Sequence, residues 1–336
     1  MARPVTQEEM QLVYNEMQTP NKLGYVLFEE GVNIDCATVF RAANEWRMVY
    51  ARQDPRVPAD KQGYETWMAR SDDLVHWEPM GRLLKQSFTG WDGYQKDGGM
   101  LLIDPEWGGS LEPEKYDGRY WMSYIGGGLP GYETDPLHIG MAYGESLEKA
   151  EEWTTFQEPV LRQDDADSRV FERKTLYKSC VIRDTEGLTG HKFIMYYNAK
   201  RAPFSIECIG MAVSDDMRTW KRYGTCETMD SGRADGAWSI AGDPQIVKFG
   251  DLYVMHFFIA YSEDGKATAV DTFACSRDLV TWTRWNGKPL IAPSIPIDEK
   301  FAHKPFLLKH DGVVYHYYCA CGDKGRGLAL AVSREV

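Results

Sequence analysis

MAVSDDMRTWKRY, from Met211 to Tyr223, is the stretch that decides the fold, because the chain repeats it. Small and apolar residues alternate as in a β-strand, a Ser/Asp turn follows, and a Trp then opens a second alternating segment. Similar stretches are found at Met68–Met80, Met141–Trp153, Phe273–Trp285 and, cut short by the end of the chain, Leu328–Val336. The pattern predicts one β-hairpin that occurs five times.

The spacing of these hairpins predicts the architecture. The Ser or Gly that opens each turn stands at Ser71, Gly144, Ser214, Ser276 and Ser333. Two more strand-like runs precede each hairpin, which gives four short strands per repeat. Five such repeats are typical of a five-bladed β-propeller, which protects its sheet edges by radial closure. We therefore expect an all-β fold with a single propeller domain over residues 22–336.

The first 21 residues are expected to form a short helical extension. Thr6 and Glu9 have the spacing of a capping box, and the apolar residues that follow fall on one helical face, which predicts a helix over Thr6–Gln18. The strand-like run Lys22–Glu29 has no hairpin partner nearby. Because the fifth repeat is cut short, we expect this strand to complete it and to lock the ring shut.

The composition excludes several classes of protein. Of the 336 residues, 43% are hydrophobic and 13% aromatic, which is enough for a sizeable core and rules out a disordered chain. The net charge of -12 argues against nucleic acid or an anionic membrane as a partner. Without an apolar leader or a long apolar run, a soluble, cytoplasmic protein is expected. Seven cysteines without CxxC spacing predict buried free thiols rather than disulfides or a metal site.

The first strand of each repeat carries the candidate functional residues. In a propeller these inner strands line a central channel and begin at the same mouth, so the residues just before them converge on one cavity. Aligned by their apolar cores, the five strands place at or next to equivalent positions Asp35, Asp97, Lys178, Asp243 and the pair His303 and Lys304. Charged residues at equivalent positions of all five strands indicate a functional site. Each also has a structural explanation: Asp35 could merely cap a strand, and Asp97 and Asp243 stand in common turn sequences.

Other residues are expected at the same mouth. Glu172 lies just upstream of the third inner strand, where a loop could lean over the channel. Three tryptophans could stack on sugar rings, although core packing explains most tryptophans equally well; they are Trp91, Trp107 and Trp238. The loops after Ser87 and over Leu129–His138 are expected to set specificity.

Acidic residues that converge in an aromatic-rimmed pocket suit glycoside hydrolysis. One carboxylate activates water and a second group protonates the leaving oxygen, and an inverting enzyme holds the two about 6.5 to 9.5 Å apart. A third carboxylate nearby raises the pKa of the acid by like-charge repulsion. The sequence contains no phosphate-cradling glycine loop, HExxH, nucleophile elbow or nucleotide fingerprint. No cofactor is expected, with room left for a structural calcium ion in the central channel.

The sequence resembles the five-bladed β-propeller glycoside hydrolases, which include families 43, 32, 68, 117 and 130. The resemblance rests on the five repeats, the Asp that opens the first blade, GDPQIVK from Gly242 and AHKPFLLKHDGVVYHYYCA from Ala302. It covers essentially the whole chain after Lys22 and is nearest to family 43-like and family 117-like members. It implies that Asp35 is the base that activates water.

The two nearest families imply different proton donors. Family 43 adds a second Asp and a Glu acid, which would be Asp97 and Glu172 here. Family 117 is described with an Asp on a late blade and a His acid, which would be Asp243 and His303. We expect Asp35 as base, Asp243 as the orienting group and His303 or Glu172 as the proton donor, since a histidine titrates near neutral pH.

The predicted activity is that of an inverting, exo-acting glycoside hydrolase of carbohydrate metabolism. It would release a terminal furanose or anhydro sugar from a small oligosaccharide or glycoside. One alternative is a phosphorylase of the family 130 type, because four cations near the mouth would suit phosphate; they are Arg173, Lys174, Lys178 and Lys304. A second alternative is a sugar-binding propeller without catalysis. The sugar, its linkage and a homo-oligomeric state stay open.

Overall fold

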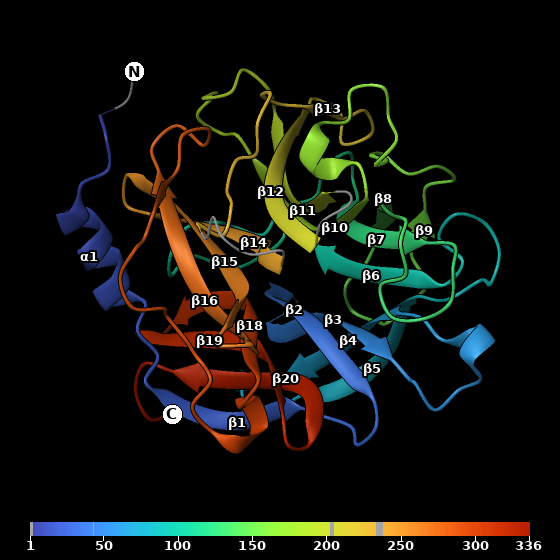
Figure 1. The fold of residues 1–336 in the computed structure, drawn as a ribbon, viewed down its shortest axis with the longest axis horizontal. Coiled ribbons are helices and arrows are strands. Elements are labelled where there is room, and N and C mark those ends of the chain that lie inside the picture. The colour runs from blue at the N-terminus through green and yellow to red at the C-terminus, as the bar shows by residue number, and fades with distance from the viewer. Residues whose placement is uncertain (1–2, 43, 202–204, 233–237) are drawn as a thin grey trace.

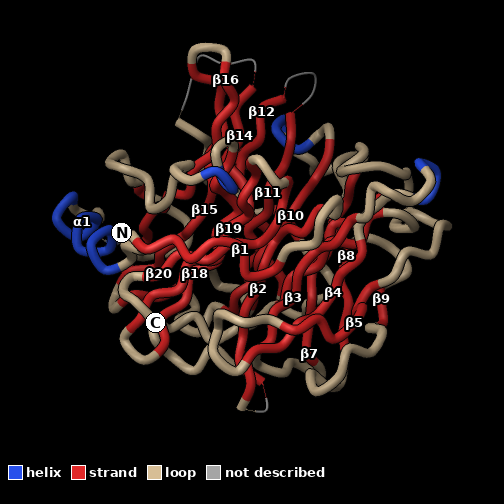
Figure 2. The backbone as a smooth tube through the Cα atoms, turned by 90° about the horizontal axis from the view of Figure 1, so that it is seen from below, coloured by secondary structure: helices blue, strands red, loops and turns tan. Residues whose placement is uncertain are grey.

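Strands make up about half of the computed structural model, which describes residues 3–42, 44–201, 205–232 and 238–336. Within these ranges the one α-helix, α1 (Gln7–Glu16), lies at the flank of the strands, and no helix combines the length and the apolar character needed to cross a bilayer (Figure 1). Viewed from below, the strands fill the middle of the molecule and the loops lie at its rim (Figure 2). The prediction of an all-β chain with a short N-terminal helix is confirmed.

The helix forms where its sequence signals predict. The Thr6 hydroxyl accepts the backbone N–H of Glu9, and the Glu9 carboxylate accepts the backbone N–H of Thr6, which completes the predicted capping box. Met10, Val13 and Met17 are fully buried against β-strands of the fourth and fifth repeats. The buried face therefore fixes the extension to the rest of the fold.

The strands form five consecutive groups in which neighbouring strands pair antiparallel. Group one is β2 (Asn33–Ala42), β3 (Glu45–Gln53), β4 (Glu65–Ser71) and β5 (Glu78–Leu84). Group two is β6 (Gln95–Met100), β7 (Tyr120–Gly127), β8 (Leu137–Gly144) and β9 (Thr154–Thr155). Group three is β10 (Thr175–Arg183), β11 (Phe193–Arg201), β12 (Ser205–Ser214) and β13 (Lys221–Arg222). Group four is β14 (Trp238–Phe249), β15 (Leu252–Glu263), β16 (Lys266–Ser276) and β17 (Thr283–Arg284).

Group five combines the two ends of the chain. It contains β18 (Phe301–His310), β19 (Val313–Gly322) and β20 (Gly325–Val332), and its fourth strand is β1 (Asn21–Leu27). β1 pairs antiparallel with β20, with Asn21 opposite Val332 and Leu27 opposite Leu328. The prediction that an N-terminal strand completes the last repeat is confirmed.

The repeated Ser/Asp turn has the same geometry in three groups. In group one, Ser71 Oγ accepts the N–H groups of Asp73 and Leu74, and Trp77 Nε1 donates to the Leu74 carbonyl. Leu74 has a φ of 68°, in the left-handed region that few leucines adopt. The same two bonds to serine recur at Ser214 and Ser276, with Met217 and Leu279 in the left-handed position. The motif therefore specifies a turn that the serine hydroxyl stabilises.

The first strands of the five groups lie beside one another around the middle of the molecule (Figure 1). β2 contacts β6, β6 contacts β10, β10 contacts β14, β14 contacts β18, and β18 contacts β2. The second of them, β6, is the shortest and ends at Met100. β6 ends early because Leu102, with a φ of 57°, cannot continue an extended strand.

Four first strands are interrupted at the same point by a β-bulge. The register shifts between Asp35 and Thr38, Leu176 and Ser179, Gly242 and Gln245, and His303 and Phe306. Within three of these bulges a non-glycine residue has a positive φ: Cys36 (56°), Asp243 (52°) and Lys304 (61°). Bulges re-aim side chains and often lie next to functional sites. They make Cys36, Asp243 and Lys304 structurally equivalent, one residue away from the position of Asp35.

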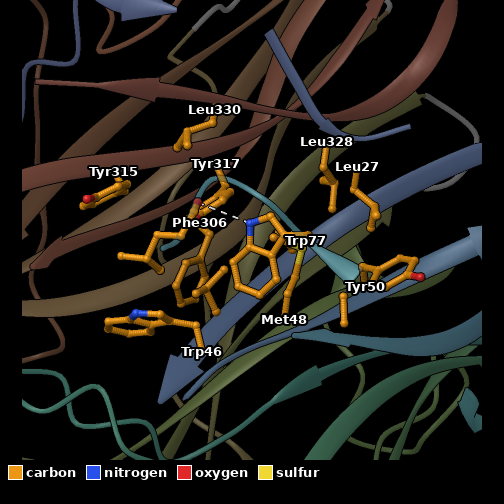
Figure 3. Close-up of a cluster of buried hydrophobic side chains, with 14 of the residues drawn as sticks. Leu27, Trp46, Met48, Tyr50, Trp77, Phe306, Tyr315, Tyr317, Leu328 and Leu330 are labelled. Carbon is orange, nitrogen blue, oxygen red and sulfur yellow. Dashed lines mark hydrogen bonds between the residues drawn. The ribbon is translucent and has the colours of Figure 1, made fainter. Parts of the chain in front are cut away.

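Apolar side chains fill the space between consecutive groups, including the space between the last group and the first. Figure 3 shows Trp77 of group one beside Tyr317 of group five, and Leu27 of β1 beside Leu328 of β20. The rings of Trp77 and Tyr317 meet edge to face with centroids 6.0 Å apart. The Tyr317 hydroxyl donates to the Leu74 carbonyl at 2.5 Å, so the repeated turn itself carries the contact.

A buried ion pair attaches β1 to group five, and its loss is expected to destabilise the fold. Lys22 Nζ lies 2.5 Å from Asp298 Oδ2, which also accepts the Tyr318 hydroxyl. Asp298→Asn leaves the ammonium without its partner, so the free energy of unfolding should fall by about 3 kcal/mol in denaturant titration. Glu78→Gln, in the exposed pair with Arg70, is the control and should change it by less than about 0.5 kcal/mol. Equal stability of the two variants would contradict this account.

Candidate active site

Two cavities lie at opposite ends of the five first strands. The strand-start cavity, about 660 Å³ with its open mouth, is lined by residues near the beginnings of these strands, among them Trp238, Phe301 and His303. The strand-end cavity, about 840 Å³ with its mouth, is lined by residues near their ends, among them Ile246 and Leu308. Four residues line both cavities and form the partition between them: Cys36, Lys178, Asp243 and Lys304.

The Lys304 ammonium group is the centre of the partition. Its Nζ atom lies 3.0 Å from Asp35 Oδ2, 3.5 Å from Glu133 Oε1 and 4.0 Å from Asp243 Oδ2. Burial alone would lower the pKa of Lys304, but the charge of Asp35 and other acidic neighbours raises it well above the usual value. Lys304 therefore stays cationic and gathers carboxylates from three different strand groups.

Asp35 lies behind the partition and anchors two cations. It is fully buried, and its Oδ2 atom accepts from Lys304 Nζ and, at 2.7 Å, from Arg326. Burial would raise the pKa of Asp35, but the charges of Lys304 and Arg326 hold it well below the usual range. Asp35 lines neither cavity, whereas Lys304 and Arg326 both line the strand-start cavity. The structure thus places Asp35 where it positions these two side chains.

Asp97 and Lys178 form a second buried ion pair at the partition. Lys178 Nζ lies 2.7 Å from Asp97 Oδ1 and 3.0 Å from the Gly98 carbonyl. Burial lowers the pKa of Lys178, but the charge of Asp97 outweighs this and leaves the pKa raised. Lys178 lines both cavities, and Asp97 lies outside both linings. Of this pair, the structure brings only the lysine to the cavity wall.

The partition does not suit the calcium ion that the sequence left room for. Calcium takes six to eight oxygen ligands. Here the ammonium groups of Lys178 and Lys304 already stand among the carboxylates of Asp97, Asp35 and Asp243. Two fixed cations at this point oppose a third, so we derive no role for calcium.

Asp243 and His303 line the strand-start cavity, as the sequence predicts. Burial raises the pKa of Asp243 to about 6, even though Lys304 and Lys178 lower it. Burial together with the charge of Arg326 lowers the pKa of His303 to about 3. His303 Nδ1 donates to the Cys319 carbonyl at 3.0 Å, so the neutral ring leaves Nε2 as an acceptor. The lowered pKa disfavours the protonated ring, which weighs against His303 as the predicted proton donor.

The cavity contains two carboxylates that the sequence reasoning missed. Glu207, on β12, is buried, and its oxygens accept from Asn198 Nδ2 at 2.9 Å and lie 3.3 Å from Lys200 Nζ. Burial raises the pKa of Glu207 to about 6, and the charge of Lys200 offsets only part of this effect. Glu133 reaches the cavity from the loop between β7 and β8, with a φ of 46° that few glutamates adopt.

The predicted aromatic residues separate into three places. Trp238 lines the strand-start cavity together with Phe258 and Phe301. Trp107 lines the strand-end cavity, and its Nε1 donates to Glu16 of α1. Trp91 lies outside both linings, stacked on Tyr124 with centroids 5.6 Å apart. Only Trp238 is therefore placed to meet a ligand beside the carboxylates.

Glu172 is not brought to either cavity. It ends a short 3-10 turn (Val170–Glu172), is fully buried, and lies outside both linings. Its Oε1 accepts from Arg169 and from the Tyr197 hydroxyl at 2.5 Å, and its Oε2 accepts from Arg222 at 2.7 Å. With every oxygen paired to a cation or hydroxyl, Glu172 serves as an anchor within group three.

A sequence signal existed for one of the missed residues. Alternation along β12 puts Glu207 on the same face as Ile209 and Met211, both buried, so an acidic residue on that face was a sign of a buried carboxylate. Glu133 and Arg326 stand in a loop and at the beginning of β20, where neither hydrophobic period nor strand order predicts where a side chain points.

Two solved structures match nearly the whole chain, although no protein-family model and no curated protein matches it. One is a BT0996 complex with RGII and the other is named "Glycoside hydrolase"; each is 42% identical, covers 99% of this chain and 97% of its own, and has a TM-score of 0.92. A thermostable family-43 glycoside hydrolase is 15% identical, with a TM-score of 0.62 over 90% of this chain and 89% of its own. At that identity the likeness concerns the fold alone.

Asp35 is expected to be essential for stability because it neutralises two cations. In Asp35→Asn the buried Lys304 and Arg326 lose their common carboxylate, so the free energy of unfolding should fall by about 3 to 5 kcal/mol. Glu114→Gln, in the more exposed pair with Arg183, is the matched control and should cost less than about 1 kcal/mol. Denaturant unfolding with fluorescence detection measures both. An unchanged midpoint for Asp35→Asn would show that this carboxylate is not the anchor.

Proposed function

The chain belongs to the glycoside hydrolases, and we propose that its strand-start cavity removes one terminal sugar at a time from a small oligosaccharide or glycoside. The observation that carries this proposal is the placement of charged side chains around the cavity. Three carboxylates, Glu133, Glu207 and Asp243, line a cavity whose floor is closed by Lys178 and Lys304. Because these ion-paired lysines close the inner end of the cavity, a substrate can enter only from the opposite end. A cavity with one entrance suits an exo-acting enzyme, which binds the end of a sugar chain.

The cavity has a polar side and an apolar side, as a sugar site requires. Trp238, Phe258 and Phe301 form an apolar wall that can pack against the C–H face of a sugar ring. Asn198 and the carboxylates face the hydroxyl groups, and the buried Asn198 Oδ1 has no protein partner. An unpartnered buried acceptor favours a hydroxyl donor from the ligand. The resemblance to families 43 and 117 directs the proposal towards furanose and anhydro sugars.

Glu207 is the proposed proton donor. A carboxyl group whose pKa is raised to about 6 by burial keeps its proton at mildly acidic pH and can deliver it to a leaving oxygen. The hydrogen bond from Asn198 fixes the direction of the carboxyl group, and Lys200, 3.3 Å away, stabilises the carboxylate once the proton has been delivered. Glu207 takes the place of both donors expected from the sequence, because His303 is neutral and Glu172 lies elsewhere.

Glu133 is the proposed base, in an inverting reaction. Its carboxylate lines the cavity and lies 3.5 Å from Lys304 Nζ, so the lysine can hold it in place for an attacking water molecule. Asp243, deeper in the cavity, is proposed to orient the sugar hydroxyls. Inversion needs the acid and the base about 6.5 to 9.5 Å apart, on opposite faces of the sugar. Asp35 supports the base indirectly, because it holds the lysine that pairs with Glu133.

We also propose that the five strand groups are the blades of a closed five-bladed propeller. The contact of β18 with β2 and the shared apolar cluster between groups one and five support closure. The pairing of β1 with β20 would then lock the ring, with residues 22–336 as one catalytic domain and residues 1–21 as an extension.

Phosphorolysis of the family 130 type remains the alternative to hydrolysis. Lys178, Lys304 and Arg326 bring positive charge to the cavity, which favours a phosphate. Each of them is already paired with a carboxylate, however, and this pairing favours water as the attacking group. Because one structure that is 42% identical to this chain is a complex with RGII, RGII is the first natural ligand to test as substrate.

Replacement of Glu207 should impair proton donation selectively. On a panel of nitrophenyl and dinitrophenyl glycosides, Glu207→Gln should lower kcat about 100- to 10,000-fold for the poorer leaving group and much less for the better one. In the wild type kcat/KM should fall as pH rises through about 6, since the donor then loses its proton. This decrease of kcat/KM with rising pH should be absent in Glu207→Gln and present in Asp243→Asn. Equal losses on both leaving groups would contradict the assignment.

The stereochemistry and the attacking group can be read in one experiment. Proton NMR of the first turnovers, in buffer with and without phosphate, should show free sugar of inverted anomeric configuration at the same rate in both. A retained anomer would contradict the single-displacement mechanism. Sugar phosphate formed only with phosphate present would favour the phosphorylase instead.

A further inference from the structure

A cluster of soft ligands lies at the beginning of group five, and the proposed hydrolysis makes no chemical use of its sulfurs. One ring nitrogen of His303 and the Sγ atoms of Cys319 and Cys321 lie within 4.8 Å of one another, and all three residues are buried. Nitrogen and sulfur donors at this mutual spacing are the ligands of tetrahedral zinc sites. Most of the other cysteines stand singly in apolar clusters, as buried thiols usually do.

The hairpin of β18 and β19 brings the three residues together. His303 on β18 is directly opposite Cys319 on β19 in the antiparallel register. Cys321 follows two residues later, so alternation places both sulfurs on the same face of the strand. The pairing of these two strands is therefore enough to bring the three residues together, and no loop residue is involved.

A disulfide does not explain the cysteine pair. Both cysteines are free thiols. Two residues apart in one strand, their Cβ atoms are about 6.5 to 7 Å apart, since each residue adds about 3.3 Å. A disulfide requires about 3.5 to 4.5 Å between Cβ atoms. A metal ion between the sulfurs bridges this separation without moving the backbone.

The surrounding groups are those that orient metal ligands. His303 Nδ1 donates to the Cys319 carbonyl, the kind of bond that holds a zinc-binding histidine with its other nitrogen free. This bond also fixes the direction of the imidazole ring, which is what a neighbouring acceptor does for a metal-bound histidine.

We propose that His303, Cys319 and Cys321 bind one zinc ion and leave its fourth position to a water molecule. Two thiolates balance the charge of Zn²⁺, and their two protons are released to solvent on binding. Zinc is favoured over calcium or magnesium because sulfur and imidazole ligands select it. The ion would join β18 to β19, beside the wall that His303 contributes to the cavity.

Metal binding to the wild-type protein tests the proposal directly. Protein stripped with a chelator under reducing conditions is titrated with Zn²⁺ and, separately, with Co²⁺ as a spectroscopic probe. One zinc equivalent per chain is expected, and cobalt should give a thiolate charge-transfer band together with the intense visible bands of a tetrahedral site. A wild-type protein that binds less than one equivalent, or gives an octahedral cobalt spectrum, would overturn the proposal.

Single substitutions then identify the ligands. Cys321→Ser and His303→Gln should each weaken zinc binding about 100-fold or more, because each removes one ligand. Cys275→Ser, at a buried cysteine of β16 outside the cluster, is the matched control and should bind as the wild type does. Unchanged affinity in Cys321→Ser would overturn the assignment. If His303→Gln fails to fold, the wild-type cobalt spectrum and Cys321→Ser still decide the matter.

Discussion

A single buried ammonium group organises the functional end of this molecule. Lys304 Nζ meets Asp35 of group one, Glu133 of the loop in group two and Asp243 of group four, while the lysine itself belongs to group five. A buried cation without carboxylates would be strongly unfavourable, and buried carboxylates without a cation equally so. The packing of the strand groups satisfies both requirements at once, because it brings these distant residues to one point.

The bulges in the first strands make this convergence possible. Regular extended strands would alternate their side chains between two neighbouring groups and send few of them towards the centre. At the bulge the backbone of Cys36, Asp243 and Lys304 adopts a positive φ, and all three side chains reach the partition. Such backbone strain at a shared position of three repeats is typical of a functional site. The partition in turn separates the strand-end cavity, whose lining includes Asp104 and Glu106, from the strand-start cavity, whose lining includes Glu133 and Glu207.

Much of the fold could be predicted from the sequence because it repeats. The alternation and the Ser/Asp turns indicated the strand groups, and the truncated last repeat predicted the pairing of β1 with β20. Asp243, Lys178, His303 and Lys304 were correctly placed at one cavity because first strands that start together bring their first residues together. Asp35 and Asp97 line neither cavity. Asp35 stands just before the bulge of β2, and Asp97 stands on β6, which has no bulge, so an alignment by apolar cores cannot bring these strands into the correct register. Glu207, on the third strand of its group, and Glu133, in a loop, were outside the reach of an argument built on first strands.

The placement of a bound sugar is the central claim, and a crystal structure of the Glu207→Gln protein tests it most directly. The crystal is soaked with whichever glycoside of the panel the wild type cleaves fastest. The account predicts the terminal sugar in the strand-start cavity, against Trp238, with its leaving oxygen within about 3.2 Å of the side chain at position 207. Sugar bound in the strand-end cavity beside Trp107, or on the outer face of the strand groups, would contradict it.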